Sequence, residues 1–245
     1  MDTILTSQRA ILIDLDGTLV DSAPDIAAAA NRMLAGLGAP PLPANTVRSF
    51  IGNGVPALVR RVLGASSSLH ETDHDLALAM FIRHYSDCNG LHSAPYPGVL
   101  QGLVTLQRLG YPLACVTNKP QRYTLPLLDV TGLSSYFSAV VCGDSTIAMK
   151  PSPAPLLDAC HRLGAQPNHC VMVGDSAVDV SAAGAAGMPV YIVRYGYHGE
   201  TELAALNSDA LIDSFDELPA LLGRTQPLQP ARSAGHDNRK HYNRR

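Results

Sequence analysis

The fold is decided by the stretch AILIDLDGT at residues 10–18. Its first four residues are apolar, which is typical of a strand that is buried on both faces of a parallel sheet. Asp16 and Gly17 then form a turn, because both residue types favour turn conformations. The stretch therefore predicts a buried strand that carries Asp14 at its carboxyl end, with Asp16 in the loop beyond it.

The same pattern recurs along the chain and alternates with helical segments. Further apolar runs lie at residues 112–117, 139–142, 170–173 and 190–193. Helical patterns lie at about residues 98–109, 153–163 and 176–186, each followed by a glycine or proline stop. This alternation predicts an α/β fold built on a doubly wound parallel sheet.

Residues 22–95 differ from the rest of the chain. They carry helical patterns at residues 24–37, 55–63 and 72–88, separated by Pro-rich and Ser-rich loops, and no good strand. Because this span separates the first strand from the second, we expect an all-α module inserted into a sheet domain of residues 1–21 and 96–223. Residues 224–245 are polar and basic. They predict a disordered tail, with contact to RNA as the alternative.

Composition narrows the classes of partner. The chain has 245 residues, of which 46% are apolar, and a net charge of −3, so nothing attracts it globally to nucleic acid or to an anionic membrane. No apolar run approaches the roughly 18–20 residues of a membrane span, and the N-terminus does not resemble a signal peptide. The five cysteines form no C-x-x-C pair, which favours the reducing cytoplasm. Both a monomer and a homodimer are compatible with the sequence.

Polar residues follow the first four predicted strands, at the end where parallel α/β sheets bind their ligands. These residues are Asp14, Asp16, Thr117, Asn118, Lys150 and Asp175, with Asp179 on the first turn of the following helix. A purely structural sheet does not need acids, a hydroxyl and an ammonium group at one edge. The pattern therefore predicts a catalytic site.

The residue types indicate phosphoryl transfer. Several acids at one edge repel each other and call for a hard divalent cation with oxygen ligands, for which Mg²⁺ is suited. Asp14 could attack phosphorus and form a covalent intermediate. Asp16 could give a proton to the leaving oxygen and later take one from water. Thr117 and Lys150 could hold the phosphate oxygens.

Four stretches resemble, in order, the four motifs of the haloacid dehalogenase superfamily. They are DLDGTLVDS at residues 14–22, VTNK at 116–119, KPSP at 150–153 and GDSAVD at 174–179. The resemblance covers nearly the whole chain to about Leu222. It implies a Rossmann-like core with a helical cap between the first two motifs.

The resemblance also implies a role for each site residue. Asp14 would be the nucleophile and a metal ligand, and Asp16 the acid/base and a metal ligand through its backbone carbonyl. Thr117 and Lys150 would bind phosphate. Asp175 would bind the metal, and Asp179 would support the site from behind its ligands.

Further stretches resemble phosphoglycolate phosphatases. They are TNKP at residues 117–120, KPSPAPL at 150–156, AGAAGMP at 183–189 and YGY at 195–197. In the cap, IGNGV at residues 51–55 resembles that family's substrate-facing loop, so Gly52 and Asn53 join Asn118 as candidate substrate contacts. The expected partner is a small phosphorylated metabolite, with 2-phosphoglycolate as the leading candidate.

Other functions remain to be weighed. Asp16 argues against a dehalogenase, and the absence of lysine from residues 22–95 argues against a phosphonate hydrolase. A sugar-phosphate phosphatase, a phosphomutase resembling β-phosphoglucomutase and a non-catalytic phosphate-binding regulator stay open as alternatives. The sequence HETDH at residues 70–74 matches a zinc peptidase signature, but it follows a serine run in a loop-to-helix transition. A solvated helix start, capped by Thr72 or Asp73, is the better interpretation.

Overall fold

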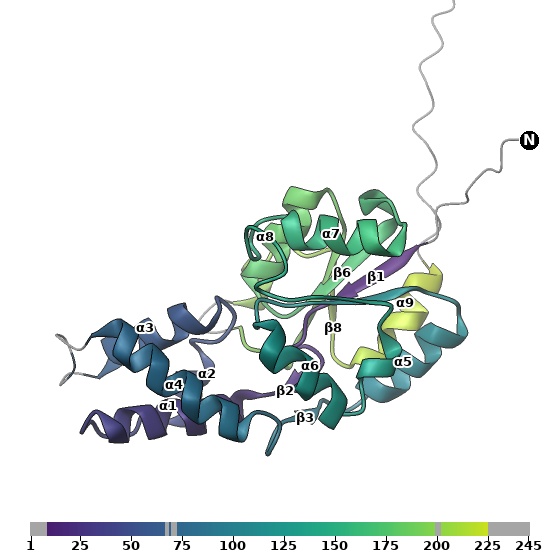
Figure 1. Ribbon diagram of the computed structural model, residues 1–245. Coiled ribbons are helices and arrows are strands. Elements are labelled where there is room, and N and C mark those ends of the chain that lie inside the picture. Colours follow the sequence, from purple (N-terminus) through teal and green to yellow (C-terminus); the bar gives the residue numbers. More distant parts are fainter. Residues whose placement is uncertain (1–8, 67–68, 70–72, 199–201, 225–245) are drawn as a thin grey trace, which may run out of the picture.

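The computed structural model describes residues 9–66, 69, 73–198 and 202–224. Figure 1 shows a sheet flanked by helices, with a further group of helices beside it. The sheet has six parallel strands in the order β5-β4-β1-β6-β7-β8, which confirms the predicted doubly wound α/β fold. The strands are β1 (Ala10–Ile13), β4 (Leu113–Val116), β5 (Ala139–Val141), β6 (Cys170–Gly174), β7 (Val190–Val193) and β8 (Ala210–Ile212).

Strand β1 lies in the middle of the sheet and is buried along its whole length. Alternate side chains point to opposite faces. Ile11 and Ile13 join one apolar cluster, whereas Ala10 and Leu12 join the other. The continuous apolar run at residues 10–13 is therefore explained by a strand that has no solvent-facing side.

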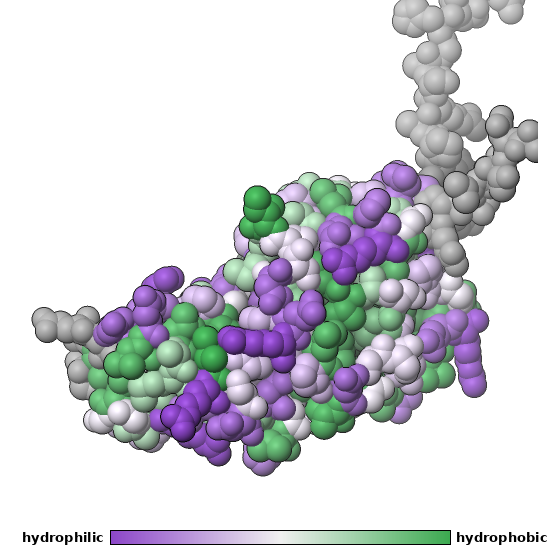
Figure 2. Space-filling view, viewed as in Figure 1, coloured by the Kyte–Doolittle hydropathy of each residue, from purple (hydrophilic) through white to green (hydrophobic). Residues whose placement is uncertain are grey.

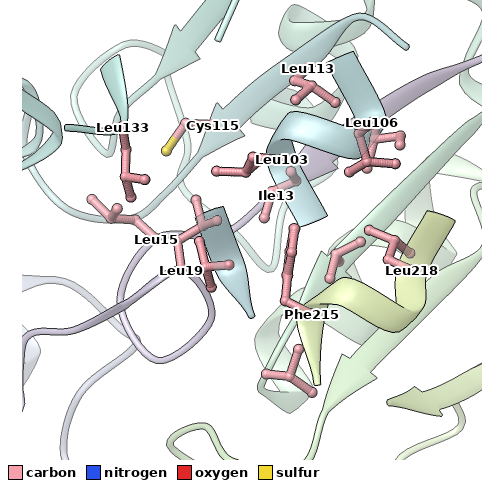
Figure 3. Packing of buried hydrophobic residues seen from close by; sticks show 14 of the residues in the cluster. Ile13, Leu15, Leu19, Leu103, Leu106, Leu113, Cys115, Leu133, Phe215 and Leu218 are labelled. Atoms are coloured by element: carbon pink, nitrogen blue, oxygen red, sulfur yellow. The ribbon is translucent and has the colours of Figure 1, made fainter. Parts of the chain in front are cut away.

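Helices cover both faces of the sheet. One face packs against α5 (Val99–Arg108), α6 (Gln121–Val130) and α9 (Leu218–Arg224). Figure 3 shows Leu103 and Leu106 of α5 packed with Ile13, Leu113 and Phe215 in that layer. The other face packs against α7 (Ala154–Leu163) and α8 (Ala177–Ala186).

The four remaining helices form a unit with its own apolar core. They are α1 (Ala23–Gly36), α2 (Ala44–Arg48), α3 (Val55–Ala65) and α4 (His74–Cys88). Helix α1 has a proline in its first turn and presents Ile26, Ala30, Met33 and Leu34 at helical spacing to α4 and α2. We call this group the helical unit. The α-helical character that the sequence indicated for this span is present in all four helices.

The chain passes between the sheet and the helical unit at two neighbouring places. A short antiparallel ladder joins β2 (Val20–Asp21) to β3 (Ala94–Pro95). Next to it, the buried carboxylate of Asp25 accepts hydrogen bonds from the backbone N–H groups of Gly90, His92 and Ser93. The expectation of no strand within residues 22–95 was therefore wrong at its edge, because a two-residue strand is too short to give an alternating pattern.

The end of the last helix differs from the prediction, and part of the HETDH stretch cannot be compared with it. Helix α9 includes Arg224, which the sequence assigned to the tail, and residues 225–245 lie outside the described residues. Residues 70–72 of the HETDH stretch also lie outside them. Asp73 caps α4 by accepting a hydrogen bond from the backbone of Asp75, as one of the two expected caps.

In the view of Figure 2, hydrophilic and hydrophobic residues are mixed over both units, and neither kind forms a single dominant patch. None of the helices in the described part of the chain combines the length and apolar character that crossing a bilayer requires. The five cysteines are buried and unpaired by disulfides.

Candidate functional site

The carboxyl ends of three central strands bring the predicted acids together. Asp14 follows β1, Thr117 follows β4 and Asp175 follows β6. One carboxylate oxygen from each of Asp14, Asp175 and Asp179 lies within 4.8 Å of the others. Residues that are up to 165 positions apart in the sequence (179 − 14) thus lie together at one edge of the sheet.

Lys150 is the cation at the centre of this cluster. Its side chain is buried, and its Nζ lies 2.9 Å from Asp14 Oδ1 and 2.8 Å from Asp179 Oδ1. It also donates to the backbone carbonyl of Val116 at 2.8 Å. Burial alone would lower the pKa of this ammonium, but Asp14 and Asp179 raise the pKa above its ordinary value. Lys150 therefore stays charged and fixes the position of Asp14.

Asp14 is held through one oxygen. Its Oδ1 faces Lys150 and accepts a hydrogen bond from the backbone N–H of Leu15 at 2.7 Å. Among the described residues, Oδ2 has no hydrogen-bond partner, and Asp14 lines a pocket. Burial raises the pKa of Asp14 to about 7, against the opposing effect of Lys150. One carboxylate oxygen is thus anchored, and the other is unpartnered among the described residues.

The acids suit a hard divalent cation. Burial raises the pKa of Asp175 well above its ordinary value, and the nearby charges of Asp179 and Asp14 add to the effect. An excess of buried carboxylates over ammonium groups is the electrostatic situation that a bound cation relieves. Oxygen donors are the ligands that Mg²⁺ prefers. The donor set therefore fits the expected metal.

Asp179 is placed by the start of α8. Its Oδ2 accepts from the backbone N–H and the hydroxyl of Ser176, which forms a capping box at the first turn. Its Oδ1 is thereby left to face Lys150. The residue therefore stabilises the helix start through one oxygen and contacts Lys150 through the other.

Asp16 also lines the pocket and has a cation of its own. Lys119 Nζ lies 2.9 Å from Asp16 Oδ1, and both side chains are nearly inaccessible to solvent. The same ammonium donates to the hydroxyl of Tyr85 on α4. The Ser22 hydroxyl also donates to Asp16 Oδ1. Sequence reasoning placed Lys119 at this edge of the sheet but assigned it no role, and it missed Tyr85 altogether.

The candidate substrate contacts are used in different ways. Asn118 donates to the backbone carbonyls of Gly52 and Lys150, at 2.9 and 2.8 Å, and accepts from the Lys150 N–H. It therefore joins the helical unit to the sheet. Gly52 lines the pocket, whereas the Asn53 side chain accepts from Arg61 on the exposed face of α3. The structure brings Gly52 and Asn118 to the pocket, but Asn53 is not among its lining residues.

The pocket lies between the two units and contains about 490 Å³ of space free of atoms, including open solvent. The sheet unit contributes the polar part of its lining and the helical unit most of the apolar part. The lining residues are Asp14, Asp16, Ile26, Ile51, Gly52, Gly54, Val55, Leu58, Phe81, Tyr85, Thr117, Asn118 and Lys119. The pocket therefore offers polar side chains on the side of the sheet and apolar side chains on the side of the helical unit.

Tyr197 connects the acid cluster to the chain crossing. Its backbone N–H donates to Asp175 Oδ2, and its hydroxyl accepts from the backbone N–H groups of Ser22 and Ala23. The hydroxyl donates in turn to Asp21. The YGY stretch entered the sequence analysis only as a likeness, because nothing in it indicated a contact with residues 21–23.

Gly17 allows the turn after β1 to approach Asp175 closely. Its backbone has φ of +85°, which favours glycine, and a Cβ atom at this position would overlap the Asp175 carboxylate and the Tyr197 ring. The aspartate-glycine turn that the sequence predicted therefore has a steric reason.

Comparisons with known proteins agree with this geometry. Residues 8–187 match the model of the haloacid dehalogenase-like hydrolase family. The chain is 57% identical over 222 residues to a plasmid-encoded phosphoglycolate phosphatase of Cupriavidus necator, with 91% of this chain and 96% of the relative covered. It is 44% identical over 220 residues to a phosphoglycolate phosphatase of Nitrosospira multiformis, with 89% and 96% covered.

A solved structure gives the same result for the fold. The crystal structure of a predicted phosphoglycolate phosphatase from Haemophilus somnus superimposes with a TM-score of 0.83 and 34% identity. The match covers 89% of this chain and 99% of that one. Family model, relatives and architecture therefore agree, and the chain belongs to the haloacid dehalogenase-like hydrolases.

Proposed function

We propose that this chain is a phosphatase that hydrolyses 2-phosphoglycolate to glycolate and inorganic phosphate. The observation that carries the proposal is the state of Asp14, which is anchored through Oδ1 while Oδ2 is unpartnered among the described residues. The substrate is supported by the relatives named phosphoglycolate phosphatase, which match this chain over most of its length.

In the first step, Asp14 Oδ2 attacks phosphorus, and the bond from phosphorus to the ester oxygen breaks. Asp16 gives its proton to that oxygen, so glycolate leaves with its hydroxyl group protonated rather than as an alkoxide. In the second step, water attacks phosphorus while Asp16 takes a proton from it. The bond between phosphorus and Asp14 breaks, which releases phosphate and restores the carboxylate.

The remaining site residues orient the reactants. Lys150 keeps Asp14 in place and adds positive charge beside the phosphoryl oxygens. The Thr117 hydroxyl accepts the backbone N–H of Lys119 at 3.2 Å and, among the described residues, keeps its own proton for a phosphoryl oxygen. Asp14 and Asp175, with the Asp16 carbonyl, would hold Mg²⁺, and the bound ion would offset the charge between carboxylates and phosphate.

The helical unit would act as a cap over the pocket. It supplies Ile26, Val55, Leu58, Phe81 and Tyr85 to the lining, so its approach to the sheet would exclude water from the reaction. We infer a cytoplasmic enzyme, since five buried free thiols suit a reducing compartment.

The test is phosphate release from a panel of phosphorylated metabolites, with Mg²⁺ and with EDTA. We expect 2-phosphoglycolate to have the highest kcat/KM by about tenfold or more, and EDTA to abolish release. Asp14→Asn should eliminate turnover, and full activity of that variant would refute the nucleophile. Higher kcat/KM for hexose or pentose phosphates would refute the substrate and leave the mechanism standing.

A further inference from the structure

Lys119 is a cation in the reaction pocket that the proposed steps do not use. Its side chain is 3% exposed, and it is the sole cationic residue that lines the pocket among the described residues. Lys150, by contrast, has three acceptors for its ammonium, Asp14, Asp179 and the Val116 carbonyl, and is not among the lining residues. Burying an ammonium group next to a pocket costs desolvation free energy unless a ligand or a neighbouring residue forms hydrogen bonds or an ion pair with it.

The neighbours of Lys119 occupy only part of its hydrogen-bonding capacity. Its three N–H groups have two acceptors among the described residues, Asp16 Oδ1 at 2.9 Å and the Tyr85 hydroxyl. Burial alone would lower the pKa of Lys119, but Asp16 and Tyr85 raise the pKa above its ordinary value, so the group is charged. One charged donor therefore remains for a pocket ligand.

The position of Lys119 relative to Asp16 specifies which ligand group it would meet. Asp16 must lie within hydrogen-bond reach of the leaving oxygen if it is to protonate it. Lys119 Nζ is one further hydrogen bond away, at 2.9 Å from Asp16. In a phosphorylated 2-hydroxy acid, the carboxylate is attached to the same carbon as the leaving oxygen. An ammonium beside Asp16 can therefore reach that carboxylate.

Charge in the pocket points to the same assignment. The acids Asp14 and Asp16 would repel an anionic leaving group, and the helical unit adds mainly apolar side chains to the lining. An acid substrate thus needs a cation close to its carboxylate, whereas a neutral alcohol does not.

We propose that Lys119 recognises the carboxylate of the leaving group and so makes the enzyme selective for the phosphate ester of a 2-hydroxy acid. The inference rests on the proposed function and assigns its substrate selectivity to one residue. Tyr85, which holds the ammonium from the side of α4, makes the recognition depend on the helical unit being in place.

The test compares 2-phosphoglycolate with 2-hydroxyethyl phosphate, in which an uncharged hydroxymethyl group replaces the carboxylate. The kcat/KM values for both are measured with Mg²⁺ for the unmodified protein, Lys119→Met and Lys119→Gln. We expect both variants to lower the preference for 2-phosphoglycolate by about 30-fold or more, as for a lost charge-assisted hydrogen bond. Arg122→Met, which removes a positive charge from the exposed face of α6, should leave the preference unchanged.

The outcomes separate this inference from the proposed function. If Lys119→Met lowers both kcat/KM values by the same factor, Lys119 only positions Asp16 and the inference is overturned. If the unmodified protein does not prefer 2-phosphoglycolate at all, the proposed substrate fails before any variant is made.

A measurement on the unmodified protein guards against variants that do not fold. In 2-aminoethyl phosphate, an aminomethyl group replaces the carboxylate, and its ammonium would repel Lys119. We expect its kcat/KM to fall below that of 2-hydroxyethyl phosphate. Turnover of 2-aminoethyl phosphate as fast as that of 2-phosphoglycolate would overturn the inference.

Discussion

The carboxylate of Asp25 offers a sharp test of how the two units are joined. The side chain is fully buried, and its Oδ2 accepts from Gly90 N and Ser93 N at 3.0 Å and from the Ser93 hydroxyl at 2.6 Å. Its Oδ1 accepts from His92 N at 3.0 Å. All of its partners are donors, so Asp25→Asn must turn an amide N–H₂ group toward at least one of them.

The cost of this change can be worked from the contacts. Placing the amide nitrogen at Oδ1 removes the 3.0 Å charge-assisted hydrogen bond from His92 N, which contributes about 1.5–3 kcal/mol, and leaves this N–H facing a donor with only its longer 3.2 Å contact to Oδ2. The other three bonds become neutral and lose roughly half of their strength. Together these losses should lower the free energy of unfolding by about 3–5 kcal/mol.

Urea unfolding followed by far-UV circular dichroism measures this loss. At a slope of about 2 kcal/mol per M, the midpoint should fall by about 2 M. Asp87→Asn is the matched control, because Asp87 is exposed on α4 and the same substitution there should change stability by less than about 0.5 kcal/mol. If Asp25→Asn lowers the free energy of unfolding by less than about 1 kcal/mol, the carboxylate does not hold residues 90–93, where the chain returns from the helical unit to the sheet.

The other predictions concern the site and its surroundings. Tyr197→Phe should lower the free energy of unfolding by about 2–4 kcal/mol, since two buried backbone N–H groups at the start of α1 lose their acceptor; chemical denaturation measures it. Gly17→Ala should weaken Mg²⁺ binding and destabilise the protein by about 1–3 kcal/mol, because its Cβ would displace the Asp175 carboxylate; calorimetric titration with Mg²⁺ tests this. Burial raises the pKa of Asp14 from 3.8 to about 7 in the folded protein. Protonation of Asp14 therefore stabilises the metal-free protein: this contribution is complete below pH 3.8 and is lost as the pH rises through about 7. Mg²⁺ should therefore raise Tm more at pH 8 than at pH 5, and an equal rise at both would contradict this account.

The central strands could be predicted because burial on both faces leaves a plain signal. Residues 10–13 and 170–173 are apolar throughout, and both form strands in the middle of the sheet. The edge strand β8 was not predicted, since it has three residues and two of them are only half-buried. Helix α6 was missed as well, because Pro126 lies inside it and normally interrupts a helix.

The candidate site shows a similar division. Acids at strand ends could be predicted because the parallel sheet itself brings those ends together, as Asp14 and Asp175 show. Lys119 could not be paired with Asp16 from the sequence, since the two are 103 residues apart and their contact depends on how the loops after β1 and β4 approach each other. The engagement of the Asn118 amide by backbone carbonyls was equally invisible, because backbone acceptors leave no mark on the sequence.

The ladder between β2 and β3 has a consequence for how such proteins diversify. Val20 pairs with Pro95 and Asp21 with Ala94, so the inserted residues leave the sheet and return to it at adjacent points. The entropic cost of closing a loop rises only slowly with its length. The sheet domain can therefore keep the same two connection points whatever segment is inserted between them. We expect the helical unit to be exchangeable between relatives through these two positions. New leaving-group preferences could then arise by recombination, without a single change in the strands that carry the acids.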